Sequence, residues 1–290
     1  MRVLAVSLQA GIWVHSFPED LILRALSNQD VEVTALRCDG VLDKNCVTLS
    51  GLGVGHAADP RDKEAACKKC RQRRKLLEIA SSVKSRFMED LLDPIDEADI
   101  DGYLQVIRPE NWTTLEFKGL QTARIAAYEF FLDNKLNSFD IPTALWERYR
   151  DLVRATCRTQ VAASRLMDEQ TPDAVLVYNG LYSMNNIVCR EAERRGVPSW
   201  AMHAGANISS RFERLYVYRS NVIPQFSWET VQWSHARNEP LSGNSVGHVF
   251  DHFLEVLRGV NRFVYSAPAG GHNVDDIRRI LRIRPESRVF

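Results

Sequence analysis

The sequence predicts an α/β fold in which helices cover both faces of a parallel β-sheet. A short apolar segment at residues 2–8 is followed by a helical pattern at residues 18–28 and a second apolar segment at residues 31–37. Such a strand, helix and strand form a βαβ unit, whose two strands run parallel. The same alternation returns at residues 173–202. Two βαβ units in one chain indicate a Rossmann-like sheet.

The first helix is expected to begin at Pro18. Proline is favoured in the first helical turn, and Glu19 and Asp20 suit the positive end of the helix dipole. The apolar residues that follow recur at the helical period. They are Leu21, Ile22, Ala25 and Leu26. Residues 9–16 are then a loop directly after the first strand.

Helices are also expected in the middle of the chain. Residues 64–92 predict one helix or two, and residues 112–170 predict a helical stretch that is broken near residues 140–142. In the second βαβ unit, the helix between the two strands is expected to end at Gly196, because glycine is favoured just past a helix C-terminus. The remaining predicted elements are a strand at residues 213–219 and helices at residues 228–238 and 244–259.

The end of the sequence indicates a domain boundary. Residues 266–273 are rich in glycine, alanine and proline, which is typical of a linker. A helical pattern at residues 275–282 follows, and the last three residues resemble the start of a strand. A domain that ended there would leave an unpaired strand edge. We therefore expect one Rossmann-like domain over residues 1–265, and a linker with the start of a missing second domain over residues 266–290.

Composition narrows the classes of protein to consider. The 290 residues include 37 basic and 37 acidic side chains, so the formal net charge is zero. This balance gives no support to a general nucleic-acid binder. No apolar run approaches the roughly 18–20 residues of a membrane span, and the N-terminal apolar run is shorter than that of a signal peptide. The expected location is cytoplasmic, with the inner face of the membrane as a further option.

Four of the six cysteines predict a metal site. Cys38, Cys46, Cys67 and Cys70 lie within 33 positions, and the last two form a C-x2-C pair. Four thiolates can surround one zinc ion in a tetrahedron, and we rank zinc ahead of an iron–sulfur cluster. The alternative is a set of four reduced thiols in a cysteine-rich insert at about residues 38–75. The other two cysteines, Cys157 and Cys189, have apolar neighbours and are expected in the core.

Ligands of open parallel sheets bind beyond the carboxyl ends of the strands. Three predicted loops lie there, at residues 9–16, 179–183 and 203–207. The first holds His15, a candidate general base because imidazole titrates near neutral pH. The candidate substrate-binding residues of the other two loops are Asn179, Gly180, Tyr182, His203, Gly205 and Asn207. The alternative is that these side chains only form hydrogen bonds within their loops.

Three segments resemble a known family. They are W-V-H-S-F-P-E-D at residues 13–20, R-C-D-G-V-L at residues 37–42 with C-K-K-C-R at residues 67–71, and Y-N-G-L-Y-S-M-N-N-I at residues 178–187 with H-A-G at residues 203–205. Together they resemble the N-terminal, acceptor-side domain of bacterial GT-B glycosyltransferases of capsule and surface-polysaccharide synthesis. The resemblance covers roughly residues 1–265.

The resemblance implies a specific activity. A GT-B enzyme has two Rossmann-like domains that face a cleft, where the sugar is transferred. The first domain binds a glycan or glycolipid acceptor, and the second binds the nucleotide-sugar donor. No catalytic metal is expected in this family, so zinc would be structural. His15 lies where the family often places a base. The donor domain is absent from this sequence, so the fragment alone is expected to be inactive.

Two alternatives stay open at this stage. One is a non-catalytic, zinc-stapled binding module that docks a protein or an anionic partner through the basic run at residues 68–75. The other is a sugar-nucleotide epimerase, which is disfavoured because residues 10–16 lack a glycine fingerprint. Peripheral association with a membrane is expected for the transferase, and nucleic-acid binding is expected for neither.

Overall fold

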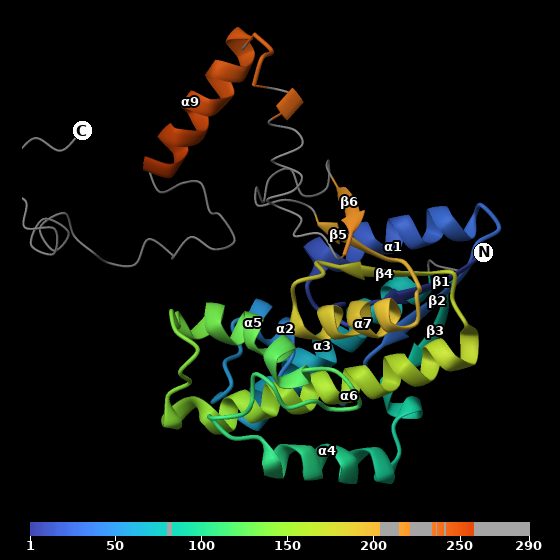
Figure 1. The fold of residues 1–290 in the computed structure, drawn as a ribbon. Helices are drawn as coiled ribbons and strands as arrows, with labels where there is room; N and C mark the ends of the chain where they lie inside the picture. The colour runs from blue at the N-terminus through green and yellow to red at the C-terminus, as the bar shows by residue number, and fades with distance from the viewer. Residues whose placement is uncertain (80–82, 204–214, 221–233, 236, 241, 258–290) are drawn as a thin grey trace, which may run out of the picture. The chain divides into compact units, whose positions relative to one another are not determined.

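The computed structural model describes residues 1–79, 83–203, 215–220, 234–235, 237–240 and 242–257 (Figure 1). The chain divides into two compact units. The first contains a six-stranded sheet and the helices α1 to α7, whereas helix α9 belongs to the second. The predicted domain boundary near residue 265, the linker and the helix at residues 275–282 lie outside the described residues, as does most of the helix predicted at residues 228–238.

The sheet is mostly parallel, which confirms the predicted α/β class. Its strands are β1 (Arg2–Val6), β2 (Glu32–Arg37), β3 (Lys84–Phe87), β4 (Ala174–Tyr178), β5 (Ser199–His203) and β6 (Tyr216–Arg219). They lie in the order β3-β2-β1-β4-β5-β6. The first five strands run parallel, and β6 pairs with β5 in the antiparallel sense. Strand order therefore reverses its direction between β1 and β4.

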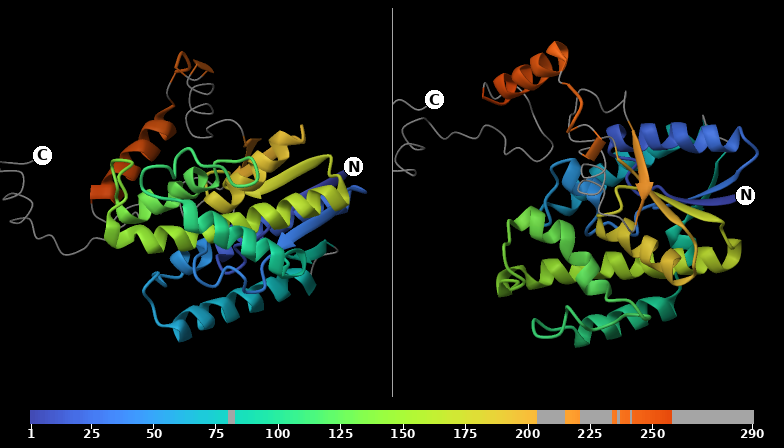
Figure 2. Two further views of the ribbon diagram at one scale, coloured as in Figure 1. Left: turned by 60° about the horizontal axis from the view of Figure 1, so that its bottom comes forward. Right: turned by 45° about the horizontal axis from the view of Figure 1, so that its top comes forward.

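Helices lie on both faces of the sheet, also as predicted (Figures 1 and 2). The helices are α1 (Trp13–Ser27), α2 (Val47–Gly51), α3 (Pro60–Ile79), α4 (Pro94–Val106), α5 (Thr122–Asn134), α6 (Trp146–Gln170), α7 (Ser183–Arg194) and α9 (Gly243–Leu257), with 3-10 turns η1 (Met88–Leu91) and η2 (Thr143–Leu145). Helix α1 covers one face and contacts α3, whereas α6 and α7 cover the other. Helices α4 and α5 pack on α6.

The alternation of side chains along each strand explains why helices cover both faces of the sheet. In β1, Leu4 and Val6 join the apolar cluster under α6 and α7, whereas Val3 and Ala5 join the cluster under α1. Successive side chains of a strand point to opposite faces, so an uninterrupted apolar strand needs cover on both sides. This is why the unbroken apolar run near the N-terminus predicted a buried strand correctly.

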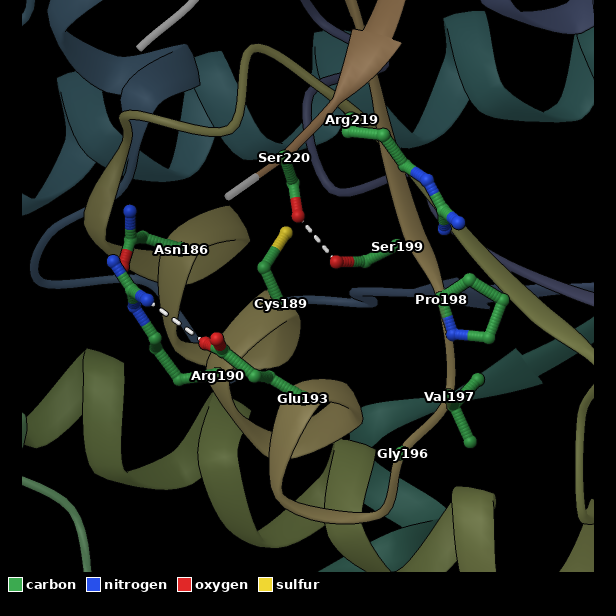
Figure 3. Close-up of a pocket in the computed structure, with 10 residues that line it drawn as sticks. All are labelled: Asn186, Cys189, Arg190, Glu193, Gly196, Val197, Pro198, Ser199, Arg219 and Ser220. Carbon is green, nitrogen blue, oxygen red and sulfur yellow. Dashed lines mark hydrogen bonds and ion pairs between the residues drawn. The ribbon is translucent and has the colours of Figure 1, made fainter. Parts of the chain in front are cut away.

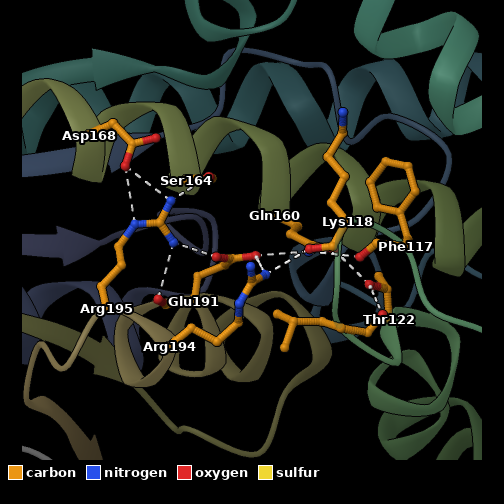
Figure 4. A network of polar contacts seen from close by, with 10 residues as sticks. Phe117, Lys118, Thr122, Gln160, Ser164, Asp168, Glu191, Arg194 and Arg195 are labelled. Carbon is orange, nitrogen blue, oxygen red and sulfur yellow. Dashed lines mark hydrogen bonds and ion pairs between the residues drawn. The ribbon is translucent and has the colours of Figure 1, made fainter.

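A buried polar network fixes α7 against α5 and α6 (Figure 4). The Thr122 hydroxyl donates to Gln160 Oε1 at 2.6 Å, and Gln160 Nε2 donates to Glu191 Oε1 at 2.8 Å. The other Glu191 oxygen accepts from Arg195, which also contacts Asp168 at 3.1 Å. Buried charges are tolerated when they are paired in this way. The network holds α7, and hence the loop that precedes it, in a fixed place.

Helix α1 begins five residues earlier than predicted, at Trp13 instead of Pro18. The backbone N–H groups of His15 and Ser16 both donate to the Ile12 carbonyl, at 2.9 and 3.0 Å. Pro18 therefore lies inside the helix, where it lacks one backbone donor. Burial of the first turns against the sheet outweighs this local signal. As a result His15 lies in the first turn of a helix and not in a loop.

Strand β3 was not predicted, and the helix expected over residues 64–92 is wrong in its last part. Helix α3 ends at Ile79, and β3 pairs with β2 from Thr34↔Lys84 onward. The strand is short and polar because it lies at the sheet edge, so it lacks an apolar pattern. The cysteine-rich segment is thus the crossover from β2 to β3 and not an insertion between βαβ units.

In the long middle stretch, residues 112–121 are irregular, so the helix predicted from residue 112 begins only with α5. Helix α6 confirms the second piece after the predicted break. Strand β6 falls inside the segment predicted at residues 213–219, and helix α9 matches the helix predicted at residues 244–259 except that it begins one residue earlier. Among the described helices, none combines the length and the apolar character that crossing a bilayer requires.

Candidate functional site

The candidate site lies at the carboxyl ends of β1 and β4. These neighbouring strands lead in opposite directions, since β1 is followed by β2 on one side and β4 by β5 on the other. The two loops that follow them therefore lead away from each other, and ligands of open α/β sheets bind at such a switch point. Residues 7–12 form the first loop and residues 179–182 form the second.

Three aromatic side chains meet at this point. The His15 ring stacks on Tyr178 with 4.5 Å between ring centroids and an interplanar angle of 21°. The His203 ring lies 6.2 Å from the same tyrosine. His15 is only 7% exposed, and Tyr178 is buried. The structure thus places two histidines that the sequence singled out separately beside one tyrosine that the sequence analysis missed.

The loop between β4 and α7 is held by one asparagine of its own and by two asparagines of α7. Asn179 has a left-handed backbone, with φ of 59°, and its Oδ1 accepts from the Leu181 N–H at 3.1 Å. Asn185 Nδ2 donates to the Asn179 carbonyl at 3.1 Å, and Asn186 Nδ2 donates to the Gly180 carbonyl at 2.8 Å. Two predicted substrate-binding residues, Asn179 and Gly180, therefore shape the loop. Contact of either residue with a substrate stays a prediction.

A carboxylate that the sequence analysis missed lies at the start of α7. Glu129 of α5 accepts from the Ser183 N–H at 2.8 Å and from the Ser183 hydroxyl. Burial raises the pKa of Glu129 to about 7, and the hydrogen bonds from Ser183 oppose the rise. Tyr182, a predicted binding residue, directly precedes this turn and is half-buried. Nothing in the spacing of the sequence pairs Glu129 with a serine 54 positions later.

A second buried carboxylate ties α1 to the loop after β1. The Ser7 hydroxyl and Gln9 Nε2 donate to Glu19 Oε2, at 3.2 and 3.3 Å. Burial raises the pKa of Glu19 to about 8, whereas the nearby Arg37 guanidinium lowers it. Glu19 was predicted to favour the positive end of the helix dipole. In the structure it is completely buried and anchors the loop instead.

Two of the predicted binding residues, Gly205 and Asn207, lie outside the described residues.

The four predicted metal ligands border one small cavity of about 20 Å³. Cys38 follows β2, Cys46 precedes α2, and Cys67 and Cys70 lie on α3. Burial raises the pKa of Cys46 to about 12, and the proximity of Cys67 and Cys70 adds to the rise. All four thiols are free. Within the described part of the chain, no three side chains of the metal-binding kinds are already arranged around one point.

The two remaining cysteines, Cys157 and Cys189, are buried in the core, as predicted.

The basic run at residues 68–75 contacts the chain itself. Arg71 contacts Glu64, Arg73 donates to the Gly11 carbonyl, and Arg74 lies 2.8 Å from Asp39. Arg74 is 6% exposed. The arginines of the run therefore form internal contacts around the cysteines and the first loop, whereas its three lysines are exposed.

A groove of about 410 Å³ lies elsewhere, between α7 and the β5–β6 pair (Figure 3). Cys189 points toward the hydroxyl groups of Ser199 and Ser220. Arg190 on its rim is already paired with Glu193 at 2.8 Å. Ser199 begins β5, so the groove is away from the carboxyl ends of the strands, and we place the candidate site at the switch point instead.

No family model matches the sequence, and no curated protein matches it. Among solved structures, a deacetylase–bog complex from the teicoplanin biosynthesis pathway has a TM-score of 0.33 and 12% identity, over 70% of this chain and 67% of that chain. The zinc-inhibited form of a teicoplanin deacetylase has a TM-score of 0.34 and 14% identity, over 70% of this chain and 67% of that chain. A deacetylase–teicoplanin complex has a TM-score of 0.34 and 14% identity, over 70% of this chain and 69% of that chain. Likeness at this level does not transfer their chemistry to this chain.

The predicted membership of the GT-B glycosyltransferases is contradicted: no family model matches the sequence, and the solved structures reported above are described as deacetylases. The acceptor-side transferase function and its nucleotide-sugar donor are withdrawn with it, and so is the alternative of a zinc-stapled binding module. The physical reason lies in the motifs themselves. Residues 13–20 and 178–187 form a helix start and a strand-to-helix loop, whose side chains fix local geometry that many α/β sheets need.

Proposed function

We propose that this chain is a hydrolase that removes an acyl group from a hydroxyl-rich substrate such as a glycan. The observation that carries the proposal is the placement of His15 and His203 around Tyr178 at the switch point. A fold by itself does not define an activity, so the argument rests on these side chains.

Imidazole supports the reaction class. It can take a proton from water and return it to a leaving group near neutral pH. His15 is nearly buried and held against Tyr178, so its orientation is fixed before a substrate binds. In the proposed reaction, His15 removes a proton from water, the resulting hydroxide attacks the acyl carbon, and the bond to the sugar oxygen or nitrogen breaks. The proton then passes from His15 to that leaving atom.

The surroundings suit a sugar. Tyr182 precedes α7, and Tyr216 lies opposite His203 in the β5–β6 register. Both tyrosines are partly exposed at the same end of the sheet, and their rings and hydroxyls provide apolar and polar contact for a sugar ring.

The test is release of acetate from a panel of N-acetylated and O-acetylated sugars by the purified chain. We expect release from at least one of them, and a roughly 10²–10⁴-fold lower rate in His15→Asn, the usual effect of losing a general base. His56→Gln is the matched control, because His56 pairs with Asp151 away from the switch point. Circular dichroism checks that each variant is folded. Absence of acetate release from every substrate, or full activity in folded His15→Asn, would overturn the proposal.

A further inference from the structure

We propose that Cys38, Cys46, Cys67 and Cys70 bind a single zinc ion, and that this site braces the loop between β1 and α1. The cysteines come from three separate parts of the crossover between β2 and β3, yet they border one cavity. Rotation of the thiols toward the cavity centre would complete a four-sulfur tetrahedron.

The cavity has the size of one ion. Its volume is about 20 Å³, and roughly 10–15 Å³ measured in this way holds one water molecule. An iron–sulfur cluster contains several iron and sulfide atoms and needs more space. A single ion with four cysteine ligands therefore fits the cavity as it stands.

Backbone donors already point at three of the four sulfurs. Cys38 Sγ accepts from the Gly40 N–H at 3.3 Å, and Cys46 Sγ accepts from the N–H groups of Thr48 and Leu49. Cys70 Sγ accepts from the Gly11 N–H at 3.1 Å. Hydrogen bonds to sulfur favour the thiolate, which is the form that binds a metal.

When the thiols of Cys38 and Cys70 act as hydrogen-bond donors, the contacts that they make are long. Cys38 lies 3.9 Å from Glu89 Oε1, and Cys70 lies 4.0 Å from Thr48 Oγ1. The Glu89 oxygen also accepts the N–H groups of Asp39 and Val41, both at 2.7 Å. It therefore keeps two hydrogen bonds when Cys38 turns toward a metal.

Two arginines of the basic run lie beside the cavity and supply part of the compensating charge, which they share with the carboxylates of Glu64 and Asp39. Four thiolates around a doubly charged ion leave a net charge of −2, which costs free energy unless cations lie nearby. Arg71 borders the cavity, and Arg74 donates to the Cys38 carbonyl at 3.2 Å. The proposed site thus gives a role to a motif that the proposed hydrolase function leaves unused.

The cluster touches the loop that leads to His15. A methyl group on Gly11 would lie 2.2 Å from Thr48 Cγ2 and 3.2 Å from Cys70 Cβ, so the loop and the cluster are in direct contact. Arg73 also donates to the Gly11 carbonyl. A bound metal would therefore restrict the loop four residues before His15.

The first experiment measures metal directly, so its outcome does not depend on the proposed activity. The chain is expressed with added zinc, purified under reducing conditions and analysed by mass spectrometry for metal content. We expect about one zinc per chain, and loss of zinc in the Cys67→Ser, Cys70→Ser double variant. The matched control is Cys189→Ser, which changes a cysteine outside the cluster and should keep its zinc. Substitution by cobalt should give the visible bands of a tetrahedral thiolate site.

A second measurement avoids the risk that a variant fails to fold. Hydrogen exchange of residues 9–16 is followed in the wild-type chain with zinc and after removal of zinc by a chelator. Slower exchange with zinc supports the bracing role. Less than about 0.3 zinc per folded chain, a disulfide among the four cysteines in the freshly purified protein, or identical exchange in both states would overturn the corresponding part of the proposal.

Discussion

The ring of His15 lies flat against the ring of Tyr178, with 4.5 Å between their centroids. His15 is in the first turn of α1, and Tyr178 is the last residue of β4. The contact therefore spans the point at which the strand order reverses. It joins the two loops that border the candidate site, so the geometry of that site depends on this pair.

Loss of the tyrosine ring should destabilise the chain. Tyr178 is 1% exposed, and Tyr178→Leu removes both ring contacts and leaves a cavity. We expect the free energy of unfolding to fall by about 2–4 kcal/mol, as for other large-to-small core changes. Tyr178→Phe keeps the ring and should cost less than about 1.5 kcal/mol. Urea unfolding followed by circular dichroism distinguishes the two; equal losses would show that the ring contributes little.

The buried Glu19 should make stability depend on pH. Its pKa is about 8 in the folded chain, against 4.5 for the ordinary side chain, so the folded state binds more protons between these values. Stability should therefore fall as pH rises from about 4.5 to 8, by up to about 1.4 kcal/mol per pH unit. Glu19→Gln should flatten this fall, and Glu32→Gln, at an exposed position, should not. Parallel curves for all three proteins from urea unfolding would contradict the prediction.

The first turn of α7 should be sensitive to Ser183. Ser183→Ala removes the hydroxyl that donates to Glu129 and leaves a buried carboxyl with one fewer donor. A cost of about 1–2 kcal/mol is expected. Ser138→Ala changes an exposed serine and should cost less than about 0.5 kcal/mol. Thermal unfolding of both variants is the measurement, and an unchanged midpoint for Ser183→Ala would show that the contact is not stabilising.

The left-handed Asn179 gives a further test. A residue with a Cβ and no polar side chain is strained at φ of 59°, so Asn179→Ala should lower stability by about 1–2 kcal/mol. Asn179→Gly removes that strain and loses only the contact with the Leu181 N–H. It should therefore be the more stable variant of the two. The reverse order in chemical unfolding would show that the side-chain contact matters more than the backbone.

Much of the architecture follows from local pattern. The apolar strands at residues 2–8, 31–37 and 173–178 were predictable because buried parallel strands form unbroken apolar runs. Strand β3 was not, because an edge strand can be short and polar. The start of α1 was misplaced because Pro18 is a strong local signal, and only packing against the sheet overrides it.

The candidate site was predictable in part. The rule for open sheets selected two loops that lie at the switch point and two histidines whose rings contact Tyr178, because it depends only on which residues follow a strand. It could not select Tyr178 or Glu129, which reach the site through alternation within a strand and through a helix from another part of the chain.

The sequence by itself determined the α/β class, the apolar strands and the spacing of the four clustered cysteines, since each is a matter of residue type and short-range period. Only the tertiary structure decided the strand order, the burial of Glu19 and the grouping of four cysteines around one cavity. These depend on contacts between distant positions, such as Gly11 with Cys70 or Glu129 with Ser183. Such contacts arise when whole elements pack, and no local pattern records them.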